Sequence, residues 1–284
     1  IYGDWYGFLF QDHDGLGRVP SILAVNWDYV DTKNNKYYPD WPMMGYYDDK
    51  GNFVNCLGTS QKVKNPLTIQ LNKSDKESYI VGDDDFSYPD FKQGDSLKKV
   101  WQWNHNPDDA NWSVTENPGY YRIKNGKVAG NIWFARNSLT QRTVGPNFTS
   151  ETCVLTENMK PGDYAGLAAI SAHYGMVGVK CDENGNRYVF QGCNSDTNSG
   201  AKAKKEDKIK ENAVSEEKIE GNAPVYLKIE YAFNTGKTRA DKANFFYSLD
   251  GENWKSIGET FSLGFDTATT FMGTRSWLVN YATK

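Results

Sequence analysis

The chain lacks the features that mark membrane-spanning and nucleic-acid-binding proteins. It contains no run of about 18 apolar residues, the length that crosses a bilayer as a helix. Its 36 Asp and Glu outnumber its 32 Lys and Arg, which gives a net charge of −4. This composition does not predict a basic face that would bind a phosphate backbone. The chain begins at Ile1 with neither the charged start nor the apolar run of a signal peptide, so this end assigns no compartment. We therefore expect no membrane and no nucleic-acid partner.

Cysteine is also scarce, and its spacing predicts neither a metal site nor a disulfide framework. The four cysteines are Cys56, Cys153, Cys181 and Cys193, with no C-x-x-C pair among them. Cys181 and Cys193 flank a hairpin turn predicted at Asn184 and Gly185, but that turn would place Cys181 opposite Arg187 or Tyr188. We therefore expect free thiols.

No cofactor is predicted, and a structural Ca²⁺ cannot be read from the sequence. The run Asp83 to Asp85 is the most acidic cluster, but consecutive side chains of an extended segment point apart, and the spacing of an EF-hand loop is absent. The pattern favours a solvated turn.

Aromatic residues and glycine are abundant. Aromatics make up 14% of the chain, which also has 26 Gly and a mean hydropathy of −0.71. Short runs that alternate apolar and polar residues indicate strands, with tight turns expected at Asn125–Gly126 and Asp250–Gly251. Residues 191–221 are rich in charge and predict a solvated excursion, with a short helix as the alternative.

Trp101 and Trp103 lie two residues apart, so on a strand both indoles leave the same face. They either line a sugar-stacking surface or fill the middle of a β-sandwich, and the core is the more common place for such residues. We expect Trp101, Trp103, Trp133 and Trp254 to be more buried than exposed.

A set of longer motifs resembles the C-terminal part of glycoside hydrolase family 43 enzymes, the β-xylosidase and α-L-arabinofuranosidase type. These motifs occur in the order of the family and span about two thirds of the chain. They are WQWNHNPD (101–108), WSVTENPGYYRI (112–123), ARNSLTQRTVGP (135–146), MKPGDYAGLA (159–168), FFYSLDGENWKSIG (245–258) and FMGTRSWLVNYATK (271–284).

The resemblance implies an all-β chain in three parts. Residues 1–45 would be a remnant of the last blade or blades of a five-bladed β-propeller, and residues 46–85 a linker. Residues 86–284 would form an antiparallel β-sandwich of jelly-roll, concanavalin A-like type without its last strand, since the family continues past NYATK with one more. The N-terminal propeller of the same chain is the expected partner domain.

Candidate substrate-binding residues follow from the same resemblance. In Phe10 to Arg18, FQDHDGLGR matches the family's final blade, which lies beside the catalytic centre. Gln11, Asp12, His13 and Arg18 are therefore candidates for the rim of the pocket. The alternative is ordinary turn chemistry, with Asp12 capping the loop and His13 a polar loop residue without function.

Phe271 is a further candidate, because the sandwich of some family members lends an aromatic side chain to the mouth of the pocket. The alternative is a phenylalanine of the sandwich core.

The function implied is that of the C-terminal portion of an inverting xylosidase or arabinofuranosidase, whose ligands are xylo- or arabinoxylo-oligosaccharides. Inversion needs an acid and a base on opposite sides of the scissile bond. No Asp or Glu here matches a catalytic position of the family, whose carboxylates lie on earlier blades, so this chain alone is expected to be inactive. The alternative function is a non-catalytic carbohydrate-binding module with exposed aromatic side chains.

Overall fold

The computed structural model describes residues 5–56, 79–92, 94–129, 132–194, 212–233, 241–264 and 272–284. The chain divides into two compact units, residues 1–12 with 18–78 and residues 13–17 with 79–284. In the part described, no helix has the length and apolar character needed to cross a membrane.

The first unit contains an antiparallel sheet in the order β1-β2-β5-β6. Its strands are β1 (Trp5–Asp12), β2 (Arg18–Asn26), β5 (Met43–Tyr47) and β6 (Phe53–Asn55). A separate hairpin pairs β3 (Tyr29–Asp31) with β4 (Lys36–Tyr38). β1 and β2 flank the turn of the FQDHDGLGR segment. β6 lies in the segment assigned to the linker, and the division into blade remnant, linker and sandwich stays a prediction.

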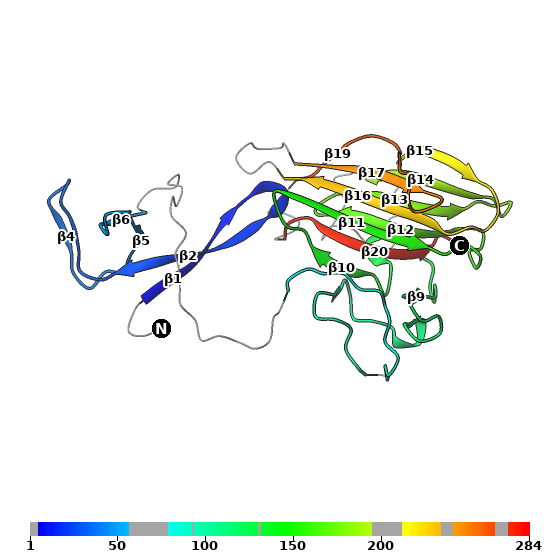
Figure 1. Ribbon diagram of the computed structural model, residues 1–284, viewed down its shortest axis with the longest axis horizontal. Helices are drawn as coiled ribbons and strands as arrows, with labels where there is room; N and C mark the ends of the chain where they lie inside the picture. The colour runs from blue at the N-terminus through cyan, green and yellow to red at the C-terminus, as the bar shows by residue number, and fades with distance from the viewer. Residues whose placement is uncertain are drawn as a thin grey trace. The chain divides into compact units, whose positions relative to one another are not determined.

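The second unit contains two large antiparallel sheets (Figure 1). The larger runs in the order β15-β14-β13-β12-β20-β10-β7. Its strands are β7 (Gln102–Trp103), β10 (Leu139–Arg142), β12 (Asp163–Ile170), β13 (Tyr174–Cys181), β14 (Arg187–Asn194), β15 (Asn212–Ile219) and β20 (Arg275–Ala282).

The smaller sheet runs in the order β11-β16-β17-β18, with β19 also paired to β17. Its strands are β11 (Asn147–Val154), β16 (Val225–Ala232), β17 (Lys242–Ser248), β18 (Lys255–Ser256) and β19 (Phe261–Ser262). β16 shows why the chain forms this layer: its residues alternate between buried and half-buried positions, the period of a strand with one face on a core.

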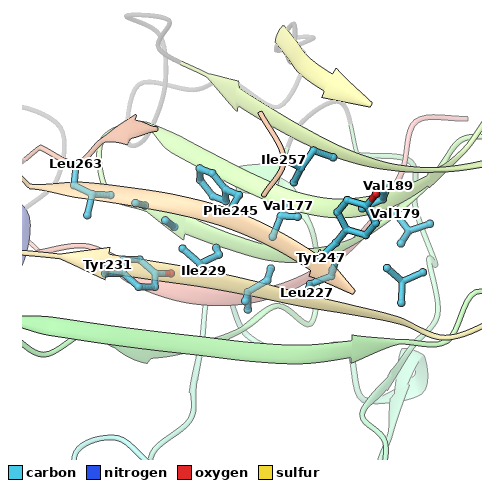
Figure 2. Close-up of a cluster of buried hydrophobic side chains, with 14 of the residues drawn as sticks. Val177, Val179, Val189, Leu227, Ile229, Tyr231, Phe245, Tyr247, Ile257 and Leu263 are labelled. Atoms are coloured by element: carbon cyan, nitrogen blue, oxygen red, sulfur yellow. The ribbon is translucent and has the colours of Figure 1, made fainter. Parts of the chain in front are cut away.

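The main core lies between the two sheets. Val177, Val179 and Val189 of the larger sheet face a layer of aliphatic and aromatic side chains from the smaller one (Figure 2). That layer comprises Leu227, Ile229, Tyr231, Phe245 and Tyr247, all 3% exposed or less. The predicted antiparallel β-sandwich is therefore confirmed.

A second core covers the outer face of the larger sheet. The 3-10 helix η3 (Ile132–Phe134) places Ile132 and Trp133 against that face. The Trp133 ring meets those of Tyr174 and Trp277 edge-on, each with centroids 6.1 Å apart. Packing on both faces explains why β12 and β13 read as nearly continuous apolar runs rather than as alternating strands.

A third, smaller core is built by the segment that precedes β10. It includes the 3-10 helix η2 (Asp109–Asn111) and the short pair β8 (Trp112–Ser113) and β9 (Arg122–Ile123). Buried Leu97, Val114 and Leu139 lie at its centre, ringed by half-buried aromatic side chains that include Trp101 and Trp103. Trp133 is buried and Trp254 half-buried, so the burial predicted for these four tryptophans is confirmed.

The predicted turns divide into two confirmed and one wrong. β13 and β14 join at Asn184–Gly185 with Cys181 opposite Arg187, as expected, and β17 and β18 join at Asp250–Gly251. The turn at Asn125–Gly126 was expected to join two strands. Instead, β9 pairs with the earlier β8, and the residues after Gly126 lead into η3 rather than into a strand.

The charge-rich stretch is also different from the prediction over part of its length. β14 continues to Asn194, and residues 212–219 form β15, an edge strand paired to β14, rather than a helix or a solvated excursion. Residues 195–211 lie outside the described residues. All four cysteines are free thiols.

Candidate functional site

The predicted pocket-rim residues lie on and beside the loop between β1 and β2. β1 and β2 pair over their whole length, ending with Asp12 opposite Arg18. The five residues between them form the short 3-10 helix η1 (Asp14–Leu16). The loop closes on itself, because the His13 N–H donates to the Gly17 carbonyl over 2.7 Å and the Gly17 N–H donates to the Asp14 carbonyl over 2.8 Å.

The loop belongs to the sandwich unit, which holds it by two hydrogen bonds to the backbone of Gly15, one from a side-chain acceptor and one from a backbone donor. The Gly15 N–H donates to Oδ2 of Asp241 over 2.8 Å, and the Gly15 carbonyl accepts from the Thr274 N–H over 2.7 Å. Asp241 is 1% exposed and Thr274 3% exposed. Water competes little with bonds buried to this extent, so they fix the position of the loop backbone.

Two glycines let the loop approach the sandwich closely. A Cβ on Gly17 would lie 2.4 Å from the Gly273 nitrogen, and one on Gly273 would lie 2.0 Å from the Leu16 carbonyl oxygen. Gly17 also has a φ of +72°, which disfavours any side chain. Leu16 packs against the main core of the sandwich. The loop is therefore inserted into the sandwich rather than resting on it.

Within the first unit, Arg18 lies between an acid and an aromatic ring. Its Nε is 3.2 Å from Oδ1 of Asp12, and its guanidinium carbon is 4.4 Å from the centroid of the Phe10 ring. The Arg18 side chain is 32% exposed and that of Asp12 55%. Such a pair adds little stability, but it orients the guanidinium, a group whose N–H donors suit hydroxyl or carboxylate oxygens.

The remaining predicted substrate-binding residues are Gln11, His13 and Phe271. Gln11 is exposed on β1, and His13 is half-buried at the start of the loop. Phe271 lies outside the described residues, so its assignment stays a prediction. Sequence reasoning missed Asp241, Thr274 and Gly273. Gly273, the glycine of FMGT, is the one of the three that the sequence could have indicated, as a small residue within a matched motif. Asp241 is a lone aspartate before a strand, which has no distinguishing pattern.

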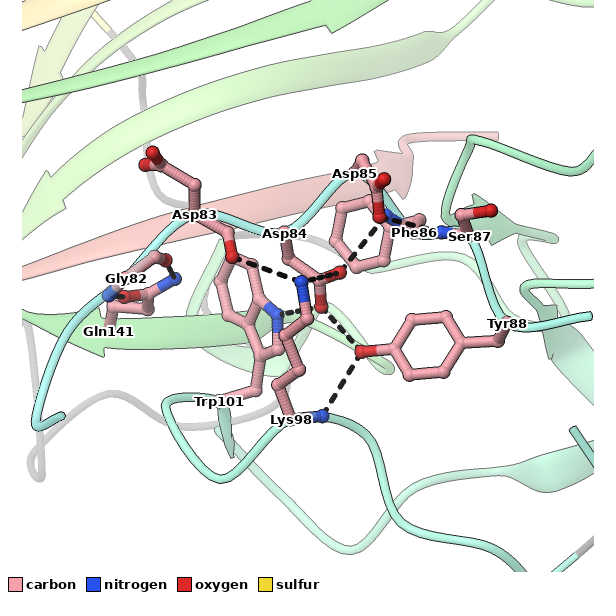
Figure 3. A network of polar contacts seen from close by, with 10 residues as sticks. All are labelled: Gly82, Asp83, Asp84, Asp85, Phe86, Ser87, Tyr88, Lys98, Trp101 and Gln141. Atoms are coloured by element: carbon pink, nitrogen blue, oxygen red, sulfur yellow. Dashed lines mark hydrogen bonds and ion pairs between the residues drawn. The ribbon is translucent and has the colours of Figure 1, made fainter. Parts of the chain in front are cut away.

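The solvated turn predicted at Asp83–Asp85 holds for Asp83 and Asp85, which are exposed, but not for Asp84. The side chain of Asp84 is fully buried, and its carboxylate accepts hydrogen bonds from the Tyr88 hydroxyl over 2.5 Å and Trp101 Nε1 over 2.8 Å (Figure 3). Lys98 Nζ lies 3.2 Å away. Asp84 therefore ties its own segment together. Across the described ranges, no group of three or more His, Cys, Asp or Glu is arranged to hold a metal ion.

A groove of about 1240 Å³ in the sandwich unit is lined by β11, β20 and residues 119–125, among others. The aromatic side chains along it are half-buried, and three of them stack, with Phe86 on Trp101 at 5.6 Å and on Tyr121 at 5.5 Å. Among the described residues of this unit, Tyr79 is the one strongly exposed aromatic residue, at 68%. This described part of the sandwich presents no pair of exposed rings for sugar stacking.

Comparison with known proteins gives the family. The model of the beta xylosidase C-terminal concanavalin A-like domain matches residues 89–284, more than half of the chain. A beta-xylosidase of Formosa agariphila is 27% identical over 300 residues, which cover 96% of this chain and 42% of the relative. The chain thus spans less than half the length of that relative.

Solved structures show the same relation. A protein described as a bifunctional GH43-CE of Bacteroides eggerthii is 34% identical with a TM-score of 0.73, covering 100% of this chain and 31% of that one. An engineered family 43 hydrolase, described as both endo-xylanase and exo-arabinofuranosidase, also has a TM-score of 0.73, covering 100% of this chain and 50% of that one. Its 23% identity shows the fold alone. The chain belongs to the beta xylosidase C-terminal concanavalin A-like domain family of glycoside hydrolase family 43 enzymes.

Proposed function

We propose that this chain is the accessory C-terminal portion of a xylosidase- or arabinofuranosidase-type hydrolase, and that its sandwich holds the β1–β2 loop at the rim of the substrate pocket. The carboxylates that cleave the glycosidic bond would come from a propeller in the complete enzyme. Gln11, Asp12, His13 and Arg18 would contact sugar hydroxyls there, on xylo- or arabinoxylo-oligosaccharides.

The observation that carries this proposal is the insertion of the loop between Asp241, Gly273 and Thr274. Two buried hydrogen bonds and a contact between two glycine backbones fix five residues, which suits a loop that must present side chains to a ligand. A loop with only a connecting role needs no such attachment.

The exposed apolar side chains of the first unit also support a role inside a larger enzyme. Phe8 is 71% exposed and Phe10 53%, and the two leave the same face of β1 because they lie two residues apart. Large exposed apolar side chains that share a face mark a surface that packs on a further protein layer, as a blade does on its neighbour. The alternative, a free-standing carbohydrate-binding module, is disfavoured by the buried tryptophans of the sandwich.

The test is kinetic and uses the complete enzyme, with this chain joined to its propeller. We expect His13→Ala and Arg18→Ala to lower kcat/KM on aryl xylosides and arabinofuranosides. Gly17→Ala should also lower it, by up to about 10²-fold, because the added Cβ displaces the loop and small displacements of positioning groups are costly. The folded state of each variant is checked by circular dichroism.

Gly185→Ala is the matched control. Gly185 has a φ of +80°, close to that of Gly17, but a Cβ there meets nothing within 4 Å. The Gly185→Ala substitution therefore introduces the same backbone strain as Gly17→Ala but displaces no neighbouring atoms. This variant should keep the activity of the unmodified enzyme. Unchanged kinetics in both His13→Ala and Arg18→Ala would remove the loop from the pocket. Unchanged kinetics in Gly17→Ala alone would remove the positioning role of the sandwich.

A further inference from the structure

Two arginines lie directly opposite each other on neighbouring strands of the larger sheet. Arg142 is the last residue of β10 and Arg275 the first of β20, and the two are register partners. In an antiparallel pair, directly opposite residues have Cβ atoms about 4.5–5.5 Å apart, and like charges there are destabilising. The placement is therefore unfavourable unless water or a counter-charge offsets it.

Arg275 cannot relieve the repulsion by turning into solvent. It is 7% exposed, and its Nε donates to Thr140 Oγ1 over 2.9 Å while Nη2 reaches the Thr140 carbonyl over 3.4 Å. Burial, and then the charge of Arg142, lower the pKa of Arg275 to about 10. A guanidinium has five N–H donors, and Thr140 engages two of its nitrogens.

Within the described ranges, no acidic side chain neutralises the pair. Among the residues that the structure describes, no ion pair involves either Arg142 or Arg275. The next register partner of Arg275 across the sheet is Ile170, and the one beyond it is Tyr174, so the row continues without a carboxylate. Arg142 is exposed and keeps its charge in water, whereas Arg275 is a buried charge without an acidic partner among the described residues. Such a buried charge is costly, which makes the pair a candidate for binding an anion.

We propose that Arg142 and Arg275 form a binding site for an oxyanion, and that its ligand is the carboxylate of a sugar acid. The planar fork of a guanidinium matches two oxygens of one carboxylate, and an anion between two such forks turns a repulsion into two attractions. Thr274, next to Arg275, donates to Gly15 of the inserted loop, so the site lies at the end of the sandwich that holds the loop. The anion site stands on this geometry alone. Its assignment to a sugar rests on the proposed function.

The experiment measures binding to the 284-residue chain, so it needs no hydrolysis. Sodium glucuronate, glucose, inorganic phosphate and N-acetyl-glutamate amide are titrated at constant ionic strength by calorimetry, with glucose as the uncharged counterpart of glucuronate. We expect glucuronate to bind and glucose not to bind. Arg142→Gln should weaken glucuronate binding by about tenfold or more, because it removes a charge-assisted bidentate contact.

Arg136→Gln is the control, since Arg136 is an exposed arginine whose Nη1 donates to the Asn106 carbonyl, and it should bind glucuronate as the unmodified chain does. Arg142→Gln should also raise the melting temperature without anion, whereas Arg136→Gln should not. This second readout needs no substitution at buried Arg275.

If the chain binds none of the anions, or if Arg136→Gln weakens glucuronate binding as much as Arg142→Gln does, the proposed anion site is wrong. Binding of phosphate without glucuronate would overturn the sugar-acid assignment. Tighter binding of the acetylated glutamate amide than of glucuronate would assign the pair to a protein carboxylate and overturn it too. The kinetics of the loop variants are independent of all these outcomes, so failure of this inference and failure of the proposed function are distinguishable.

Discussion

At the scale of single residues, Asp84 shows how one buried carboxylate can order a segment that has little regular structure. Its oxygens accept from Tyr88, Trp101 and the Phe86 N–H and pair with Lys98 (Figure 3). Burial by itself would raise the pKa of Asp84, but the hydrogen bonds from Tyr88 and Trp101 outweigh it and hold the pKa below 3.8. Burial and the bond to Asp84 raise the pKa of Tyr88 to about 12.

We predict that Asp84→Ala lowers the free energy of unfolding by about 2–4 kcal/mol, because it leaves buried donors and Lys98 without their acceptor. Because the folded pKa lies below the ordinary value, the stabilisation is present above pH 3.8 and is lost as the pH falls through the lowered pKa. The difference between wild type and Asp84→Ala should therefore shrink in acid.

Urea unfolding from pH 7 to pH 2 measures both effects. Asp83→Ala is the control, because Asp83 is exposed and touches Lys98 through its carbonyl alone, and it should change stability by less than about 0.5 kcal/mol. Equal losses in the two variants at pH 7 would show that Asp84 has no special role.

At the scale of elements, η3 has more influence than its three residues suggest. It closes the outer face of the larger sheet with Trp133, which is 8% exposed and meets both Tyr174 and Trp277 edge-on. Without it, the apolar outer face of β12, β13 and β20 would be in water.

We predict that Trp133→Ala costs about 3–5 kcal/mol of stability, since it removes the largest side chain over that face. Trp254→Ala should cost about 1–2 kcal/mol, because Trp254 is half-buried and its ring lies 4.4 Å from Lys228 Nζ at the edge of the smaller sheet. Thermal unfolding of the two variants measures both losses of stability. A larger loss for Trp254→Ala would mean that η3 is not part of the cooperative core.

The sequence predicted those elements whose signal is local. β16 alternates buried and half-buried residues, and the Asp250–Gly251 turn has a standard hairpin dipeptide, so both could be predicted without tertiary information. The Asn125–Gly126 turn carried the same kind of signal, but the residues after it pack as η3 on the outer face of the sheet, which no strand pattern reveals. β15 was missed because an edge strand with one partner can be rich in charge.

The candidate site was predictable only from resemblance. FQDHDGLGR placed the loop, but its attachment depends on Asp241 and Gly273, which are more than 220 residues away in the sequence, as the separation of 226 between Gly15 and Asp241 shows. Contacts at such separation leave no periodic pattern in a single sequence. The same holds for Arg142 and Arg275, whose pairing requires the order of strands in the sheet.

At the scale of the whole molecule, the central claim is that this chain positions substrate-binding groups and leaves bond cleavage to the rest of the enzyme. The loop contains His13, and the strand ends beside it contain Asp12 and Arg18, but no pair of carboxylates there matches the acid and base positions of the family. Loss of both groups removes proton transfers worth roughly 10²–10⁴-fold each.

The most direct measurement is the hydrolysis of aryl β-xylosides and aryl α-L-arabinofuranosides by the isolated 284-residue chain, compared with the complete enzyme under the same conditions. The account predicts no rate above buffer for the isolated chain and turnover by the complete enzyme. Turnover by the isolated chain that rises with its concentration, and that falls in His13→Ala or Arg18→Ala purified in the same way, would contradict it.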